Sequence, residues 1–177
     1  MADVKHKVPF FSQKTHILEV EWQPKGCGVT ALKMIMEYWK QKNPMNISPQ
    51  IPDLIATGLE IKSYVKDIGW SHQGLVNLAY KYGYGGYHMD LSKINTGEAW
   101  QMLKTDLDKY PVMVSVYPHF DAGKTGGHIV TLTGLNNGLV SFNDPEEETE
   151  MAGSKTIPKT DFLKGWKQRY IIIKPKK

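Results

Sequence analysis

Apolar residues recur at helical spacing through the first two thirds of the chain. The clearest run is Cys27–Trp39, where apolar side chains three or four residues apart stand in a background of good helix formers. A second run, Ser71–Tyr82, has Ser71 in place for an N-cap and glycines soon after it. Gly97–Lys109 ends before a proline and predicts a further helix, and a short helix is expected around Asp53–Thr57.

The pattern changes to one typical of strands after Pro111. Val, Ile, Tyr and Thr, which favour strands, are concentrated in four segments: Val112–Tyr117, His128–Leu135, Leu139–Asn143 and Tyr170–Lys174. Because the helices precede the strands, we expect an α+β fold with a largely antiparallel sheet rather than a doubly wound parallel one. The length of 177 residues suits a single domain covering residues 1–177.

Composition excludes several classes of protein. A single cysteine rules out an internal disulfide framework and any site built from several thiolates. The histidines other than His128 are scattered without metal-ligand spacing, so we expect neither a metal nor a cofactor. The net charge of +4 owes much to lysines near the C-terminus, and no basic stripe suited to nucleic acid is present.

The sequence carries no targeting or membrane signal that we can identify. No apolar stretch approaches the length needed to cross a bilayer, and the first residues lack the apolar core of a secretory signal. We therefore expect a soluble protein, either cytoplasmic or a secreted form that has lost its signal peptide. The sequence does not choose between these compartments and leaves the oligomeric state open.

The single cysteine stands at the start of the clearest predicted helix. In Gly26-Cys27-Gly28 the sulfur would lie among unpaired backbone N–H groups at the positive end of the helix dipole, which favours a thiolate over a thiol. The flanking glycines would leave room for a substrate carbonyl. Cys27 is therefore the candidate nucleophile, and the alternative is a small buried residue at a helix N-terminus.

A histidine begins the second predicted strand, directly after Gly126 and Gly127. A thiol nucleophile needs an imidazole beside it, and the imidazole needs a third group that fixes its orientation. The glycines would let a substrate approach the backbone closely. His128 is therefore the candidate base, and the alternative is an ordinary histidine within a sheet.

Asp144 is the candidate for the third group, and the hairpin before it offers a test by register. If Asn136–Gly138 forms a three-residue loop, Asp144 lies opposite Val130. Val130 shares a face with His128, so Asp144 and His128 would be diagonal neighbours within reach of a hydrogen bond. We favour this loop because glycine in its third position suits the left-handed backbone required there.

A two-residue turn at Asn137–Gly138 is the alternative, since Asn-Gly also makes good turns of this kind. Asp144 would then lie opposite Thr131, on the other face of the sheet. Asn143 would instead share the face of His128, although farther along it. A further acidic run, Glu146–Glu148, is expected to be a solvated loop near the edge of the site, where it would disfavour acidic substrates.

Four segments together resemble the bacteriocin-processing, double-glycine peptidases of the papain superfamily, and in particular their stand-alone peptidase-like branch: Val8–Gln13, Gly26–Met34, Gly127–Gly134 and Asn143–Pro145. The resemblance covers most of the chain. It implies a papain-like fold in which the cysteine, at a helix N-terminus, packs with the N-terminal helices on a C-terminal antiparallel sheet. No transporter segment of the kind fused to the leader peptidases is present.

The resemblance also implies a catalytic triad of Cys27, His128 and Asp144, and a glutamine that donates to the oxyanion. Gln13 matches the Ser-Gln position of the family, in a short segment expected to be extended. Its spacing from Cys27 is longer than usual, and Gln23 is the rival for the same role. The backbone N–H of Cys27 would be the second donor.

These expectations favour a cysteine peptidase that cleaves the amide bonds of a peptide or protein substrate through a thioester intermediate. The same triad would also serve an acyltransferase of the transglutaminase or phytochelatin-synthase kind. The alternative from another class is a noncatalytic peptide-binding module, although a binder has no need of all three side chains. The sequence does not identify the substrate.

Overall fold

The structure, a computed structural model, describes residues 4–176. The ends of the predicted 1–177 domain, residues 1–3 and 177, lie outside the described residues, and its single-domain character stays a prediction. The helices are η1 Val20–Lys25, α1 Cys27–Lys42, α2 Ile51–Glu60, α3 His72–Lys81, α4 Thr96–Leu107, η2 Pro118–Phe120, α5 Glu150–Gly153 and α6 Lys159–Gly165. The strands are β1 Val4–Lys5, β2 Tyr64–Val65, β3 Gly69–Trp70, β4 Tyr84–Asp90, β5 Val112–Val116, β6 His128–Asn136, β7 Leu139–Asn143, β8 Ser154–Pro158 and β9 Trp166–Pro175.

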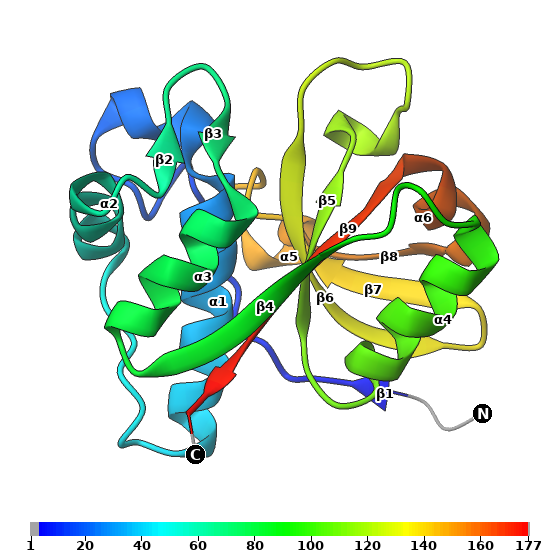
Figure 1. The fold of residues 1–177 in the computed structure, drawn as a ribbon, viewed down its shortest axis with the longest axis horizontal. Coiled ribbons are helices and arrows are strands. Elements are labelled where there is room, and N and C mark those ends of the chain that lie inside the picture. Colours follow the sequence, from blue (N-terminus) through cyan, green and yellow to red (C-terminus); the bar gives the residue numbers. More distant parts are fainter. Residues whose placement is uncertain (1–3, 177) are drawn as a thin grey trace.

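The main sheet is antiparallel throughout and has the strand order β4-β9-β5-β6-β7-β8, with β1 pairing beside β6. Helices α1, α2 and α3 gather at one end of the molecule, and strands β6, β7 and β8 with helices α4 and α6 gather at the other (Figure 1). The predicted α+β fold, with Cys27 at a helix N-terminus and a largely antiparallel sheet, is confirmed.

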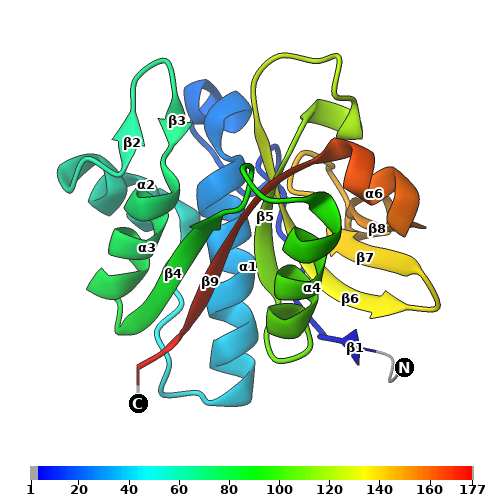
Figure 2. The same ribbon diagram turned by 45° about the vertical axis from the view of Figure 1, so that its right-hand side comes forward.

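The central strands are buried on both faces, which explains their nearly continuous apolar sequences. All five residues of β5 are buried. Met113 and Ile171 pack into the core under α1, α2 and α3, whereas their neighbours Val114 and Ile172 pack into a second core against α4 and α6. Strand β9 runs between the helical and strand-rich ends of the molecule (Figure 2). The N-terminus of α1 lies against the start of β6.

Most predicted helices are present with shifted ends. Helix α1 starts at Cys27 as predicted, and Ser71 caps α3 by accepting a hydrogen bond from the backbone of Gly74 at 3.0 Å. The helix expected around Asp53–Thr57 is longer, because Pro52 fits its first turn. The Val8–Gln13 segment forms no regular strand.

The predicted three-residue hairpin loop is wrong. Asn137 and Gly138 form a two-residue turn, with both residues at positive φ (48° and 79°), so Asn136 pairs with Leu139. A β-bulge at Thr133 then inserts one residue into β6 and shifts the register before the site.

The shift restores the pairing that the three-residue loop would have given. Thr131 pairs with Asn143, so Asp144 comes opposite Val130, on the face of His128. The predicted neighbourhood of Asp144 and His128 is therefore confirmed, although by a turn and a bulge rather than by a longer loop.

Candidate active site

Cys27 is half-buried and opens α1, whose preceding residue Gly26 is the N-cap. Both flanking glycines are explained by packing rather than by access for a substrate, which corrects the sequence interpretation. A side chain at Gly26 would collide with Ile17, and a Cβ at Gly28 would lie 2.9 Å from the Cβ of Trp70. The glycines thus let the segments around the site close tightly onto the first turn of α1.

His128 and Asp144 form a buried pair. The Nε2 atom of His128 lies 2.7 Å from Oδ1 of Asp144, and each residue is 8% exposed. The same carboxylate oxygen accepts a hydrogen bond from the backbone N–H of Glu146 at 3.1 Å. The other oxygen, Oδ2, lies 3.1 Å from the ammonium group of Lys155.

Hydrogen bonds and charges change the pKa values of this pair more than burial does. Burial opposes protonation of His128, but its hydrogen bonds with Asp144 and Cys27 raise the pKa of the imidazole above its usual value. Burial would also raise the pKa of Asp144, yet its bond with His128 holds that pKa well below the usual range. Around neutral pH the pair is therefore an imidazolium bound to a carboxylate.

The thiol of Cys27 interacts with the same imidazole, and this interaction changes the pKa of the thiol. Burial alone would raise the pKa of the thiol. The hydrogen bond and the positive charge of His128 outweigh it, and backbone N–H groups at Gly28 and Ile129 add to the effect, so the pKa of Cys27 is lowered. The predicted helix N-terminus contributes through one of these amides, and the histidine contributes more.

The two candidate glutamines are placed differently. The side-chain amide nitrogen of Gln13 donates to the carbonyl oxygen of Gln23 at 2.8 Å, and the backbone N–H of Gln13 donates to Pro145 O at 2.8 Å. Gln13 thereby spans the space between the Asp144 loop and the approach to Cys27. The amide of Gln23 instead donates to Ile17 O at 3.0 Å.

Cys27 and His128 lie in the wall of a cleft of about 1060 Å³. Its lining includes an aromatic group: Trp22, Tyr64 and Trp70 contact one another, with ring centroids 5.0 to 6.1 Å apart. The lining also includes Ser115 and Lys167. An open, partly apolar cleft beside a cysteine and a histidine suits an extended chain of amino acids.

Apart from His128, the charged side chains lining the cleft are Lys25, Lys66, Asp67, Lys167 and Arg169, so the basic groups outnumber the acidic one. None of the run Glu146–Glu148 lines it, and Glu147 is bound to Lys155 at 2.6 Å. The expected place of this run near the edge of the site fits Glu146, which brings a carboxylate oxygen within 4.8 Å of His128 and Asp144 ligand atoms, and its effect on acidic substrates stays a prediction.

His72 lines the cleft, although the sequence pattern did not single it out as a site residue. Its Nε2 atom lies 2.6 Å from Oγ of Ser115, and both line the cleft. Burial, with the nearby charges of His88 and Arg169, lowers the pKa of His72 to about 4. His72 is therefore neutral at physiological pH. No local sequence signal distinguished it from the other histidines.

The contacts of the possible ligand atoms at this site do not favour a metal ion. Within residues 4–176, His128, Asp144 and Glu146 bring possible ligand atoms within 4.8 Å of one another. The histidine nitrogen and one aspartate oxygen already bond each other, and Lys155 places a positive charge on the other oxygen. A cation would have to break the first bond and approach the lysine, so we assign no metal.

The sequence over nearly the whole chain matches one known family. Residues 5–171 match the Peptidase_C39 like family. The chain belongs to this family. The resemblance to bacteriocin-processing peptidases is thereby confirmed, and family and fold together indicate a C39 cysteine peptidase-like protein. None of the curated protein sequences compared with the chain gives a significant match.

Solved structures share the architecture of this C39-like chain at low sequence identity. A C39-like peptidase from Bacillus anthracis has a TM-score of 0.65 at 19% identity and covers 99% of this chain and 100% of its own. The peptidase domain of Streptococcus ComA, a bifunctional ABC transporter of a quorum-sensing pathway, has a TM-score of 0.64 at 18% identity, covering 86% and 93%. At such identities the likeness establishes the C39 fold.

A third solved structure contains a bound peptide. It is a double-glycine-motif protease from an AMS/PCAT transporter, in complex with the leader peptide, with a TM-score of 0.61 and 19% identity over 99% of this chain and 100% of its own.

Among residues 4–176 of the C39-like chain, no helix has the length and apolar character needed to cross a bilayer.

Proposed function

We propose that this protein is a cysteine peptidase in which Cys27, His128 and Asp144 hydrolyse a peptide bond through a thioester. The observation that carries the proposal is the meeting of Cys27 and His128 in the wall of a cleft, with Asp144 bonded to the imidazole of His128 at 2.7 Å and the pKa of the thiol lowered by the same histidine. A noncatalytic binder has no use for this arrangement.

The geometry gives each group a role. Asp144 occupies Nε2 of His128, which leaves Nδ1 to face the sulfur. The thiolate of Cys27 attacks the carbonyl carbon of the substrate, and the imidazolium of His128 gives its proton to the departing amine. Water, deprotonated by His128, then attacks the thioester, which releases the carboxylic acid and restores the thiolate of Cys27 and the imidazolium of His128.

Gln13 is our choice for the oxyanion donor. Its amide nitrogen has two N–H groups, and Gln23 O takes only one of them, so the second is available for the developing negative charge. The backbone N–H of Cys27 would supply the other hydrogen bond. Within residues 4–176 the buried side-chain oxygen of Gln13 has no hydrogen-bond partner, which fits a side chain held for its nitrogen.

We expect Gln13→Ala to lower kcat by about 100-fold with little change in KM, because an oxyanion donor acts chiefly in the transition state. Gln23→Ala is the matched control, since the anchor of Gln13 is the backbone oxygen of Gln23 and survives the substitution. Steady-state kinetics on one peptide substrate measure both. Equal losses in the two variants would remove Gln13 from this role.

The substrate is a peptide, as in the neighbour that holds a leader peptide, and the excess of basic side chains in the cleft favours acidic residues near the scissile bond. We expect Lys167→Glu to lower kcat/KM for a Glu-containing peptide by about 3- to 10-fold relative to its Gln analogue. The difference should shrink as salt is added. An unchanged ratio of the two peptides would show that Lys167 does not select charge.

The decisive assay incubates the protein with a peptide library and identifies products by mass spectrometry, with Cys27→Ala as the control. Hydrolysis that disappears in Cys27→Ala supports the peptidase. Products joined to an added amine, without free acid, would instead identify an acyltransferase. Peptide binding with no product in either protein would favour the binding module.

A further inference from the structure

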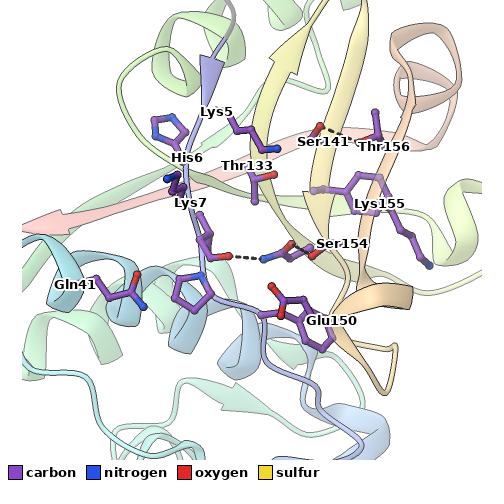
Figure 3. Close-up of a pocket in the computed structure, with 15 residues that line it drawn as sticks. Lys5, His6, Lys7, Gln41, Thr133, Ser141, Glu150, Ser154, Lys155 and Thr156 are labelled. Carbon is purple, nitrogen blue, oxygen red and sulfur yellow. Dashed lines mark hydrogen bonds between the residues drawn. The ribbon is translucent and has the colours of Figure 1, made fainter.

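Lys155 lies directly behind the proposed triad, and no sequence pattern singled it out. Its ammonium group is 3.1 Å from Oδ2 of Asp144 and 2.6 Å from Oε1 of Glu147. The side chain is 34% exposed, so the amine reaches the carboxylates from a partly solvated position. Figure 3 shows Lys155 on the β8 side of a pocket between the N-terminal segment and the sheet, with its ammonium end turned away from Lys5 and Lys7.

The position of Lys155 follows from strand register. Lys155 pairs with Phe142 across β7 and β8, and Asp144 is two residues beyond Phe142 on the same face. The backbone N–H of Asp144 also donates to Gly153 O at 2.9 Å, which fixes the start of β8 against the end of β7. His128, Asp144 and Lys155 therefore form a polar row across three neighbouring strands.

The two carboxylate oxygens of Asp144 accept hydrogen bonds from different groups. Oδ1 accepts from His128 at 2.7 Å and from the backbone of Glu146 at 3.1 Å. Oδ2 accepts from Lys155. A carboxylate held at both oxygens cannot rotate about its own axis, so Oδ1 stays directed at the imidazole.

We propose that Lys155 is a positioning residue for the reaction: it holds Asp144 in the orientation that bonds His128, and its charge tempers the attraction of Asp144 for the imidazolium proton. The inference rests on the proposed function, since it assigns Lys155 a role in support of the proposed triad. Glu147 in turn holds the ammonium group of Lys155 in place.

The charges around His128 set the direction of the effect. The thiolate of Cys27 approaches from α1 and the carboxylate of Asp144 from the end of β7, and a carboxylate oxygen of Glu146 lies within 4.8 Å of ligand atoms of His128 and Asp144. Lys155 is the cation that balances these anions from β8. Without it, the imidazolium holds its proton to higher pH and the thiolate forms only at higher pH.

The test compares Lys155→Met with Lys155→Arg by the pH profile of peptide hydrolysis and of Cys27 alkylation. In Lys155→Met we expect both limbs of the profile to move to higher pH by about half a unit to one unit, after discounting for the exposure of the amine. At neutral pH kcat should fall about 5- to 10-fold with KM nearly unchanged. Lys155→Arg should restore both the profile and kcat.

Lys164→Met is the matched control, because Lys164 forms an ordinary exposed ion pair with Asp161 and should leave the profile in place. If Lys155→Met fails to fold, Lys155→Gln decides: its amide can still donate to Asp144 but carries no charge, so the profile should again move to higher pH. A folded Lys155→Met, or Lys155→Gln, with the profile of the unaltered protein overturns the inference alone. An unaltered protein that neither reacts at Cys27 nor cleaves peptides overturns the proposed function as well.

Discussion

Cys27 is expected to react with iodoacetamide at pH values well below the ordinary thiol pKa of about 8.5, and His128→Ala is expected to lose that reactivity. The reason is the hydrogen bond and charge of His128, which lower the pKa of the buried sulfur. In the variant only burial remains as the main influence, and it favours the unreactive thiol. Because the chain has one cysteine, the alkylation rate followed by mass spectrometry reports on this site alone.

The sign of the pH dependence follows from the two pKa shifts. Reactivity and hydrolysis should rise as pH increases through the lowered pKa of Cys27, where the thiolate forms. Hydrolysis should fall again as pH increases through the raised pKa of His128, where the proton for the leaving amine is lost. If Cys27 does not react with iodoacetamide, or if His128→Ala leaves the alkylation rate unchanged, Cys27 and His128 do not form a thiolate site.

Asp144→Ala is expected to lower kcat by about 100- to 10,000-fold, because His128 loses the partner that fixes its orientation. The substitution also leaves the amine of Lys155 without one of its carboxylates. Asp144→Asn should be milder, since the amide oxygen can still accept from Nε2 while the negative charge is gone. Kinetics on one peptide, with circular dichroism to confirm folding, measure the difference.

Asp161→Asn provides the control, since Asp161 binds Lys164 at 3.0 Å in an exposed pair and should change kcat little. An Asp144→Ala variant that is folded and nearly as active as the unaltered protein would exclude Asp144 from catalysis. An Asp144→Asn variant as impaired as Asp144→Ala would instead show that the charge, rather than the orientation, is what His128 requires.

The residues of the candidate triad could be found from sequence because each carries a local signal. Cys27 begins the clearest helical pattern, and His128 begins a strand after two glycines. Their proximity could not be computed from these signals, since they are far apart in the chain. It depends on how α1 meets β6, which is a property of the packed core.

The bulge at Thr133 shows why the register was harder to predict than the strands. Its cause is not local: the carbonyl oxygen of Thr133 accepts a hydrogen bond from the backbone N–H of His6 at 2.6 Å, next to the pairing of β1 with β6. The Asn-Gly turn was read as a longer loop, and the bulge was not foreseen. The two errors cancel at Asp144.

Strand β4 was missed for a different reason. Gly83, Gly85 and Gly86 were interpreted as the end of the preceding helix, which is correct for Gly83 at φ 87°. Gly86 lies within β4, where a side chain would collide with the backbone oxygen of Ile172 in β9. A glycine needed for close strand approach and a glycine that ends a helix look the same in one sequence.

Strand β9 lies between β4 and β5 in the main sheet, although it follows all the other strands in the chain. During synthesis the segments that carry Cys27, His128 and Asp144 therefore emerge before the strand that joins the two halves of the sheet. We expect the reactive groups to be aligned only after β9 is inserted between β4 and β5.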